Sequence, residues 1–113
     1  GALIMIQIPL QTIPNQSLSI QLDNINYDFV IRSMPGTSNI MVFDITIDNE
    51  LIAEGVRAVP AYPLIEYKYL ENGNFIVITN NDDYPDWQQF QISQFLLYAS
   101  QTEIEAIQNG TGT

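Results

Sequence analysis

The sequence predicts an all-β fold, a small antiparallel barrel or sandwich of about six to seven strands with a short C-terminal helix. Two observations lead to this prediction. Apolar and polar residues alternate over several short segments, as in strands that are buried on one face. Turn signals rich in Asn, Asp, Gly and Pro separate these segments, while the sequence lacks the helical patterns between strands that an α/β fold needs.

The clearest segment, residues 17–33, is expected to form a β-hairpin with one apolar face. Its arms flank a polar turn at residues 23–26, whose Asp and Asn side chains tolerate positive φ. The apolar face comprises Leu18, Ile20, Leu22, Tyr27, Phe29 and Ile31. Such a hairpin needs a second layer to cover that face, which the rest of the chain is expected to supply.

Strands are also expected on both sides of this hairpin. Residues 5–8 alternate before Pro9, which cannot donate to a sheet ladder and so indicates a strand end or an edge. Residues 40–48 form the most apolar segment, which predicts a central strand. They are expected to pair with residues 51–59, where Gly55 indicates a bulge or a close backbone approach.

The second half of the chain predicts a further hairpin, a last strand and the helix. Asn72-Gly73 is a strong signal for a tight hairpin leading into residues 75–79, and residues 95–98 form the final core strand. Residues 102–108 are predicted to be helical. Thr102 and Glu105 fit the spacing of a capping box, and Ile104 and Ile107 lie on one face.

Length and composition predict a single β domain over residues 1–113. Residues 1–4 are interpreted as a tag remnant before a native start at Met5, and residues 109–113 as a flexible tail. The 3 basic residues stand against 13 acidic ones, a formal net charge of -10. Nucleic acid and anionic membranes are therefore not expected as partners, because no Lys/Arg patch can neutralise phosphates.

The chemistry of the side chains argues against an enzyme, and the sequence predicts no catalytic, cofactor-binding or metal-binding residues. The chain has neither cysteine nor histidine, which removes thiolate chemistry, the commonest general base and the commonest transition-metal ligand. The acidic loop Asp82–Asp86 offers oxygen ligands for a cation, but its spacing does not fit an EF-hand. A solvated turn is the favoured interpretation of this loop. Arg32 and Arg57 are expected to pair with nearby carboxylates.

Two sets of residues are candidates for an interface. Tyr62, Tyr84 and Trp87 lie in the least regular part of the chain, where capping of the core and a contact surface are equally good interpretations. The second set is Ile4, Ile6 and Ile8 in the almost uncharged N-terminal strand. We expect this strand to pair with a partner or with a second copy, so that a chain starting at Gln11 stays folded but loses assembly.

Residues 5–33, MIQIPLQTIPNQSLSIQLDNINYDFVIRS, resemble the opening of the small plug proteins of contractile-tailed phage baseplates. Phe43-Asp44-Ile45, the strand 51–57 followed by Pro63-Leu64, and residues 94–98 continue the resemblance up to Tyr98. The helical tail departs from it. The resemblance implies a virion structural protein near the hub and the tube end, assembled in the bacterial host cytoplasm, with other baseplate or hub proteins as partners and no catalytic residues or cofactors.

Two functions from other classes remain open at this point. A carbohydrate- or peptide-binding β module would use Tyr62, Tyr84 and Trp87 as its platform. A small acidic inhibitor would use the negative field to meet a basic host protein, and its binding would collapse at high salt. The sequence leaves the oligomeric state open, with a homo-oligomer as one expectation.

Overall fold

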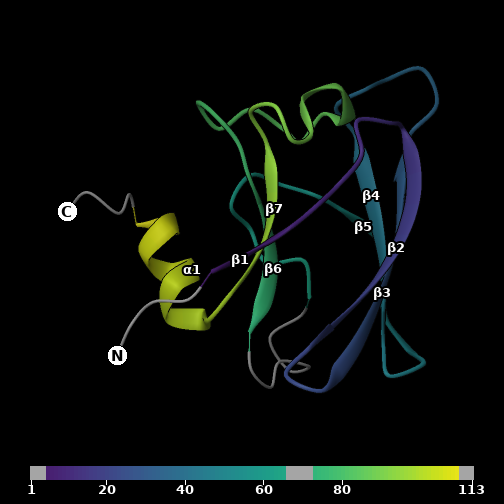
Figure 1. The fold of residues 1–113 in the computed structure, drawn as a ribbon. Coiled ribbons are helices and arrows are strands. Elements are labelled where there is room, and N and C mark those ends of the chain that lie inside the picture. The colour runs from purple at the N-terminus through teal and green to yellow at the C-terminus, as the bar shows by residue number, and fades with distance from the viewer. Residues whose placement is uncertain (1–4, 66–72, 110–113) are drawn as a thin grey trace.

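A computed structural model describes residues 5–65 and 73–109 of the chain. These residues form two antiparallel β-sheets that face each other, and one helix lies on the far side of the smaller sheet (Figure 1). The sheets stay separate among the described residues, so the fold is a sandwich and not a closed barrel. The predicted all-β class with a short C-terminal helix is confirmed.

The larger sheet is a meander of four strands in the order β2-β3-β4-β5. Its strands are β2 (Asn15–Leu22), β3 (Ile25–Ser33), β4 (Met41–Ile47) and β5 (Glu50–Arg57). Alternation sets which side chains of these strands face the core, because the side-chain period of a strand is two. In β3 the buried residues are Tyr27, Phe29 and Ile31, as the sequence predicts.

The smaller sheet has the order β1-β7-β6, so the chain begins in it, builds the larger sheet and then returns. Its strands are β1 (Ile6–Ile8), β6 (Asn74–Ile78) and β7 (Phe95–Ala99). The strand β7 lies between the other two and is antiparallel to both. The first and last strands of the domain therefore pair with each other, and β1 ends before Pro9 as expected.

Both hairpins of the larger sheet turn over two residues with positive φ. Asp23 and Asn24 join β2 to β3 with φ of 52° and 65°, and Asp48 and Asn49 join β4 to β5 with φ of 47° and 72°. Positive φ at both central residues is the type I′ geometry, which matches the twist of the flanking strands. Asp and Asn tolerate this region better than most residues, so the local sequence fixes the register of both hairpins.

The predicted bulge at Gly55 is confirmed. The pairing of β4 with β5 shifts register between Phe43 and Ile45, and Gly55 adopts a φ of +66°. Its amide no longer faces a ladder partner on β4. It donates instead to Oδ1 of Asp44 at 2.7 Å, so a side chain replaces the lost backbone acceptor.

The core lies between the sheets and contains a cluster of four aromatic rings, Tyr27, Phe29, Phe75 and Tyr98. The ring of Phe75 meets those of Phe29 and Tyr27 edge-on, at centroid distances of 4.8 Å and 5.0 Å. Edge-to-face pairs of this kind add stability beyond the area that they bury, about 0.5–1.5 kcal/mol each. The cluster joins β3 of one sheet to β6 and β7 of the other.

The helix α1 (Gln101–Gln108) covers the outer face of the smaller sheet with Ile104 and Ile107, the two residues predicted for its apolar face. The predicted capping box at Thr102 and Glu105 is wrong. The box lies two residues earlier: Ser100 accepts from the amide of Glu103, and the Glu103 carboxylate accepts from the amide of Ser100 at 2.8 Å. Thr102 has the same spacing, but the helix has already begun there.

A side chain covers the outer edge of β6. The amide group of Asn74 accepts from the backbone N–H of Ile65 and donates to its carbonyl, at 3.1 Å and 2.9 Å, as a neighbouring strand would. Two backbone bonds from Ala61 and Leu64 extend this cover along β6. The hairpin predicted at Asn72-Gly73 falls largely on residues 66–72, which lie outside the described residues.

Candidate interaction surfaces

The described residues contain no group of three or more acidic, histidine or cysteine side chains that could hold a metal ion. The Asp82–Asp86 loop contributes to structure through Asp86. Its Oδ1 accepts from the amide of Gln88 at 2.9 Å and so caps the 3₁₀ turn Trp87–Gln89, while its Oδ2 accepts from the hydroxyl of Ser38 at 3.1 Å. Both oxygens of Asp86 are thus engaged in holding the loop.

Among the described residues, no helix is both apolar and long enough to cross a lipid bilayer.

The structure places the three aromatic candidates in different environments. Tyr62 follows Ala61, which has a positive φ of 56°, and its side chain is 63% exposed. Tyr84 is 42% exposed, whereas Trp87 is partly buried and packs against the core. Trp87 therefore contributes to capping the sandwich, and of these three candidates Tyr62 and Tyr84 are available to a partner.

Arg57 has partners that the sequence did not predict. Instead of pairing with a carboxylate of the described chain, its guanidinium stacks 4.3 Å from the ring centroid of Tyr84 and donates to the Asn39 carbonyl at 3.4 Å. A cation over an aromatic face is stabilised by the ring quadrupole. Arg57 comes from β5 and Tyr84 from a loop far along the chain, so only tertiary structure brings them together. This stacking occupies one face of Tyr84, which a sugar platform would need.

A polar hollow lies beside this pair, between the loop that precedes β4 and the segment that precedes β7. Asn39, Asp83, Asp86 and Gln94 are among the residues that line it. Gln94 is buried and accepts from the amide of Asp86 at 2.7 Å, which holds two parts of the segment before β7 together. Carboxylate and amide side chains therefore make up most of the lining of the hollow.

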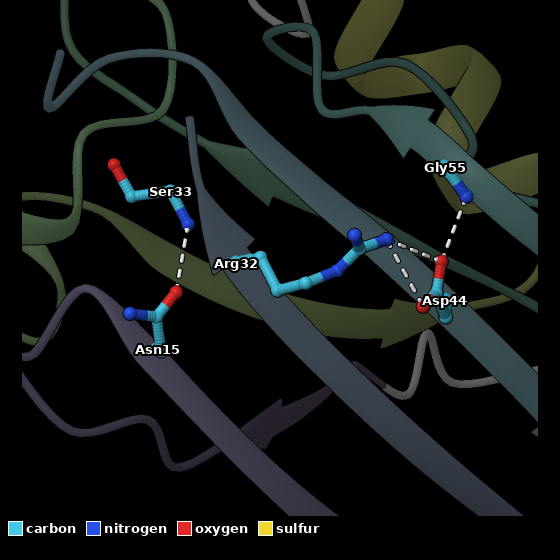
Figure 2. A network of polar contacts seen from close by, with 5 residues as sticks. All are labelled: Asn15, Arg32, Ser33, Asp44 and Gly55. Atoms are coloured by element: carbon cyan, nitrogen blue, oxygen red, sulfur yellow. Dashed lines mark hydrogen bonds and ion pairs between the residues drawn. The ribbon is translucent and has the colours of Figure 1, made fainter. Parts of the chain in front are cut away.

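The outer face of the larger sheet carries a network that the sequence predicts in part (Figure 2). Arg32 of β3 pairs with Asp44 of β4, with its Nη2 2.9 Å and 3.0 Å from the two carboxylate oxygens, as expected of a cation on a mostly acidic chain. Asp44 Oδ1 also accepts the amide of Gly55, so one carboxylate joins the ion pair to the bulge. This network is exposed and structural.

Of the three predicted edge-strand residues, Ile4 lies outside the described residues. Ile6 is half-buried and pairs with Tyr98 of β7, and Ile8 is fully buried in the core of its own chain. Ile8 is thus committed to folding. The outer edge of β1 stays open among the described residues, and an interface through Ile6 stays a prediction.

The comparison with protein families decides the class. Residues 5–102 match the family model described as cyanophage baseplate Pam3 plug gp18, which spans both sheets and ends within α1. The chain belongs to the phage baseplate plug family. A search of curated proteins found no match. Baseplate plugs are components of the phage virion with a structural role, and other baseplate proteins are their partners.

Proposed function

We propose that this protein is a non-enzymatic plug at the centre of a contractile-tail baseplate, next to the hub and the end of the tail tube. The observation that carries the proposal is the family match over residues 5–102, which extends across every strand of the sandwich. The chemistry of the described surface supports a structural role, because its polar clusters serve to cap turns and bulges. Assembly takes place in the bacterial host cytoplasm before the tail is complete.

The contact surface that we propose includes Tyr62, Tyr84 and the exposed edge beside Ile6. Exposed aromatic side chains are enriched at protein interfaces, because they bury much area and keep a polar group for hydrogen bonding. The net charge of -10 favours a neighbouring baseplate protein with a basic surface at this contact.

The test is incorporation into particles. Phage that carry Tyr62→Ser or Tyr84→Ser should yield baseplates with less plug protein than the parent, measured by quantitative mass spectrometry of purified tails. Leu51→Ser is the matched control, because Leu51 is 52% exposed but lies on β5, outside the proposed contact. Folding of each purified variant is checked by circular dichroism.

Cryo-electron microscopy of the same baseplates tests the position. Density for the sandwich at the hub and the tube end supports the proposal. Density at the periphery of the baseplate, or tails that assemble and contract normally when the gene is deleted, would refute it.

A further inference from the structure

We propose that the outer edge of β2 is a self-association site, at which a second copy of this chain pairs antiparallel around Ser19 and joins the two four-stranded sheets into one. This inference concerns the chain alone and does not depend on its place in the baseplate. It is based on three features of β2: the direction of its backbone groups, its composition and its self-complementary order of side chains.

The hydrogen bonds around β3 establish which groups of β2 point outward. The carbonyl of Asn26 accepts from Asp48, and its amide donates to the Asp48 carboxylate, so the backbone of Asn26 faces β4. In an antiparallel pair, residues alternate between bonding one neighbour and the other. Asn26 lies opposite Gln21, so the backbone groups of Gln21 also point away from β3.

The same alternation applies along β2. The N–H and C=O groups of Ser17 and Ser19 therefore face outward, together with those of Gln21. The amide of Ser33 agrees with this alternation, because it points back toward β2 and donates to the side chain of Asn15. No other strand of the described chain lies beyond β2 in the sheet order. An open edge of this length is a template for another strand.

The other edges of the two sheets among the described residues are bulged, covered or short. The strand β5 carries the bulge at Gly55 together with the charged residues Glu50, Glu54 and Arg57. The strand β6 is covered by Asn74 and the segment 60–65, and β1 has three residues before Pro9. In contrast, β2 has eight residues, NQSLSIQL, without a charge or a proline, and its pairing with β3 has no register shift.

Pairing around Ser19 places polar residues opposite polar residues and apolar residues opposite apolar residues. Ser19 lies opposite its own copy and Ser17 lies opposite Gln21 of the second copy, and each of these pairs can exchange two backbone hydrogen bonds. On the other face, Leu18 and Ile20 are half-buried in the single chain and lie opposite each other across the axis. The dimer thus buries apolar against apolar and places no charged side chain directly at the axis, on a chain of net charge -10.

A cysteine cross-link tests both the contact and its register, because the chain has no cysteine of its own. Residues opposite each other in a bonded antiparallel pair have Cα atoms about 5.5 Å apart, within the range of a disulfide. Ser19→Cys should therefore give a covalent dimer under mild oxidation. Ser17→Cys is the matched control, because its copy lies about 14 Å away, four residues along the strand.

Light scattering over a concentration series gives the mass of the unmodified chain. A reversible dimer, with at least tenfold more cross-linked product from Ser19→Cys than from Ser17→Cys, supports the proposal. Ser19→Pro removes the central outward N–H, and should keep the fold by circular dichroism but abolish the dimer.

Three results would overturn the proposal. The first is a chain that stays monomeric at every concentration. This result includes the case in which the backbone amides of β2 become protected from hydrogen exchange only when another baseplate protein is added. The second is a dimer that Ser19→Cys fails to cross-link. The third is equal cross-linking of Ser17→Cys and Ser19→Cys, which would mean a different register.

Discussion

At the scale of single residues, Gly55 is a position where conformation limits the choice of side chain. Its φ of +66° lies in the left-handed region, yet a Cβ placed there would meet no atom within 4 Å. Gly55→Ala should lower the free energy of unfolding by about 1–2 kcal/mol, the usual cost of this region for a residue with a Cβ. Urea unfolding measures the loss.

Gly55→Asn is the control for this prediction, because Asn adopts positive φ more readily than Ala. Its loss should be clearly smaller than that of Gly55→Ala. Equal losses would mean that space and solvation, and not backbone conformation, determine the residue at the bulge.

Tyr98 gives the domain a specific sensitivity to alkali. Burial raises the pKa of its phenol, while the neighbouring Tyr27 side chain lowers this pKa in part and the charge of Asp23 raises it further. Because the pKa is higher in the folded state, the unfolded state loses its proton first. The contribution of this pKa difference to the free energy of unfolding is fully present below about pH 10, and it is lost as the pH rises from there through the raised pKa.

The variant Tyr98→Phe keeps the aromatic packing but cannot ionise. The free energy of unfolding of the parent should therefore fall more steeply above about pH 10 than that of Tyr98→Phe. The other 5 of the 6 tyrosines are present in both chains and cancel in the comparison. Denaturant titrations at several alkaline pH values measure the free energy of unfolding of both chains. If this free energy falls equally in both as the pH rises, burial does not raise the pKa of Tyr98.

At the scale of elements, β1 is part of the domain's own sheet. It pairs with β7, Ile8 is fully buried and Leu10 almost so. Loss of a buried Ile or Leu side chain costs about 2–5 kcal/mol, while a domain of this size has about 5–15 kcal/mol in total. A chain that starts at Gln11 should therefore be unfolded or strongly destabilised, unlike the sequence-based expectation that it stays folded.

A chain that starts at Met5 is the matched control, and it should unfold at the same temperature as the full chain. Circular dichroism and thermal unfolding of the three chains make the comparison. A cooperative transition in the chain that starts at Gln11, within a few degrees of the control, would show that β7 does not need β1 to hold its place.

At the scale of the whole molecule, the net charge of -10 sets the response of assembly to salt. Two copies repel each other over distances of about 10 Å at 0.1 M salt, and added salt screens this repulsion. The proposed dimer through the uncharged β2 edge should therefore become tighter between low and high NaCl. Binding to a basic baseplate neighbour should weaken over the same range, because there the charges attract.

Sedimentation at several salt concentrations separates these two cases. A homodimer that dissociates as salt increases would contradict pairing through β2 and indicate that charged groups hold the copies together.

The sequence by itself determined the strands, their buried faces and the turns of the larger sheet. The alternation in Ser17–Ser33, the Asp-Asn turns and Gly55 act through neighbours along the chain, and local sterics and side-chain period are enough to set them. The family was also recognisable at this level, because its pattern of strands and turns is spread over most of the chain.

Only the tertiary structure decided how distant segments meet. The pairing of β1 with β7, the stacking of Arg57 on Tyr84 and the cover that Asn74 gives to the edge of β6 join residues without a local signal. The capping box shows the same limit, since Ser100 and Thr102 have equal spacing to a glutamate and the end of β7 decides where the helix begins. Which sheet edge stays open follows from the complete strand order, and no single segment contains that information.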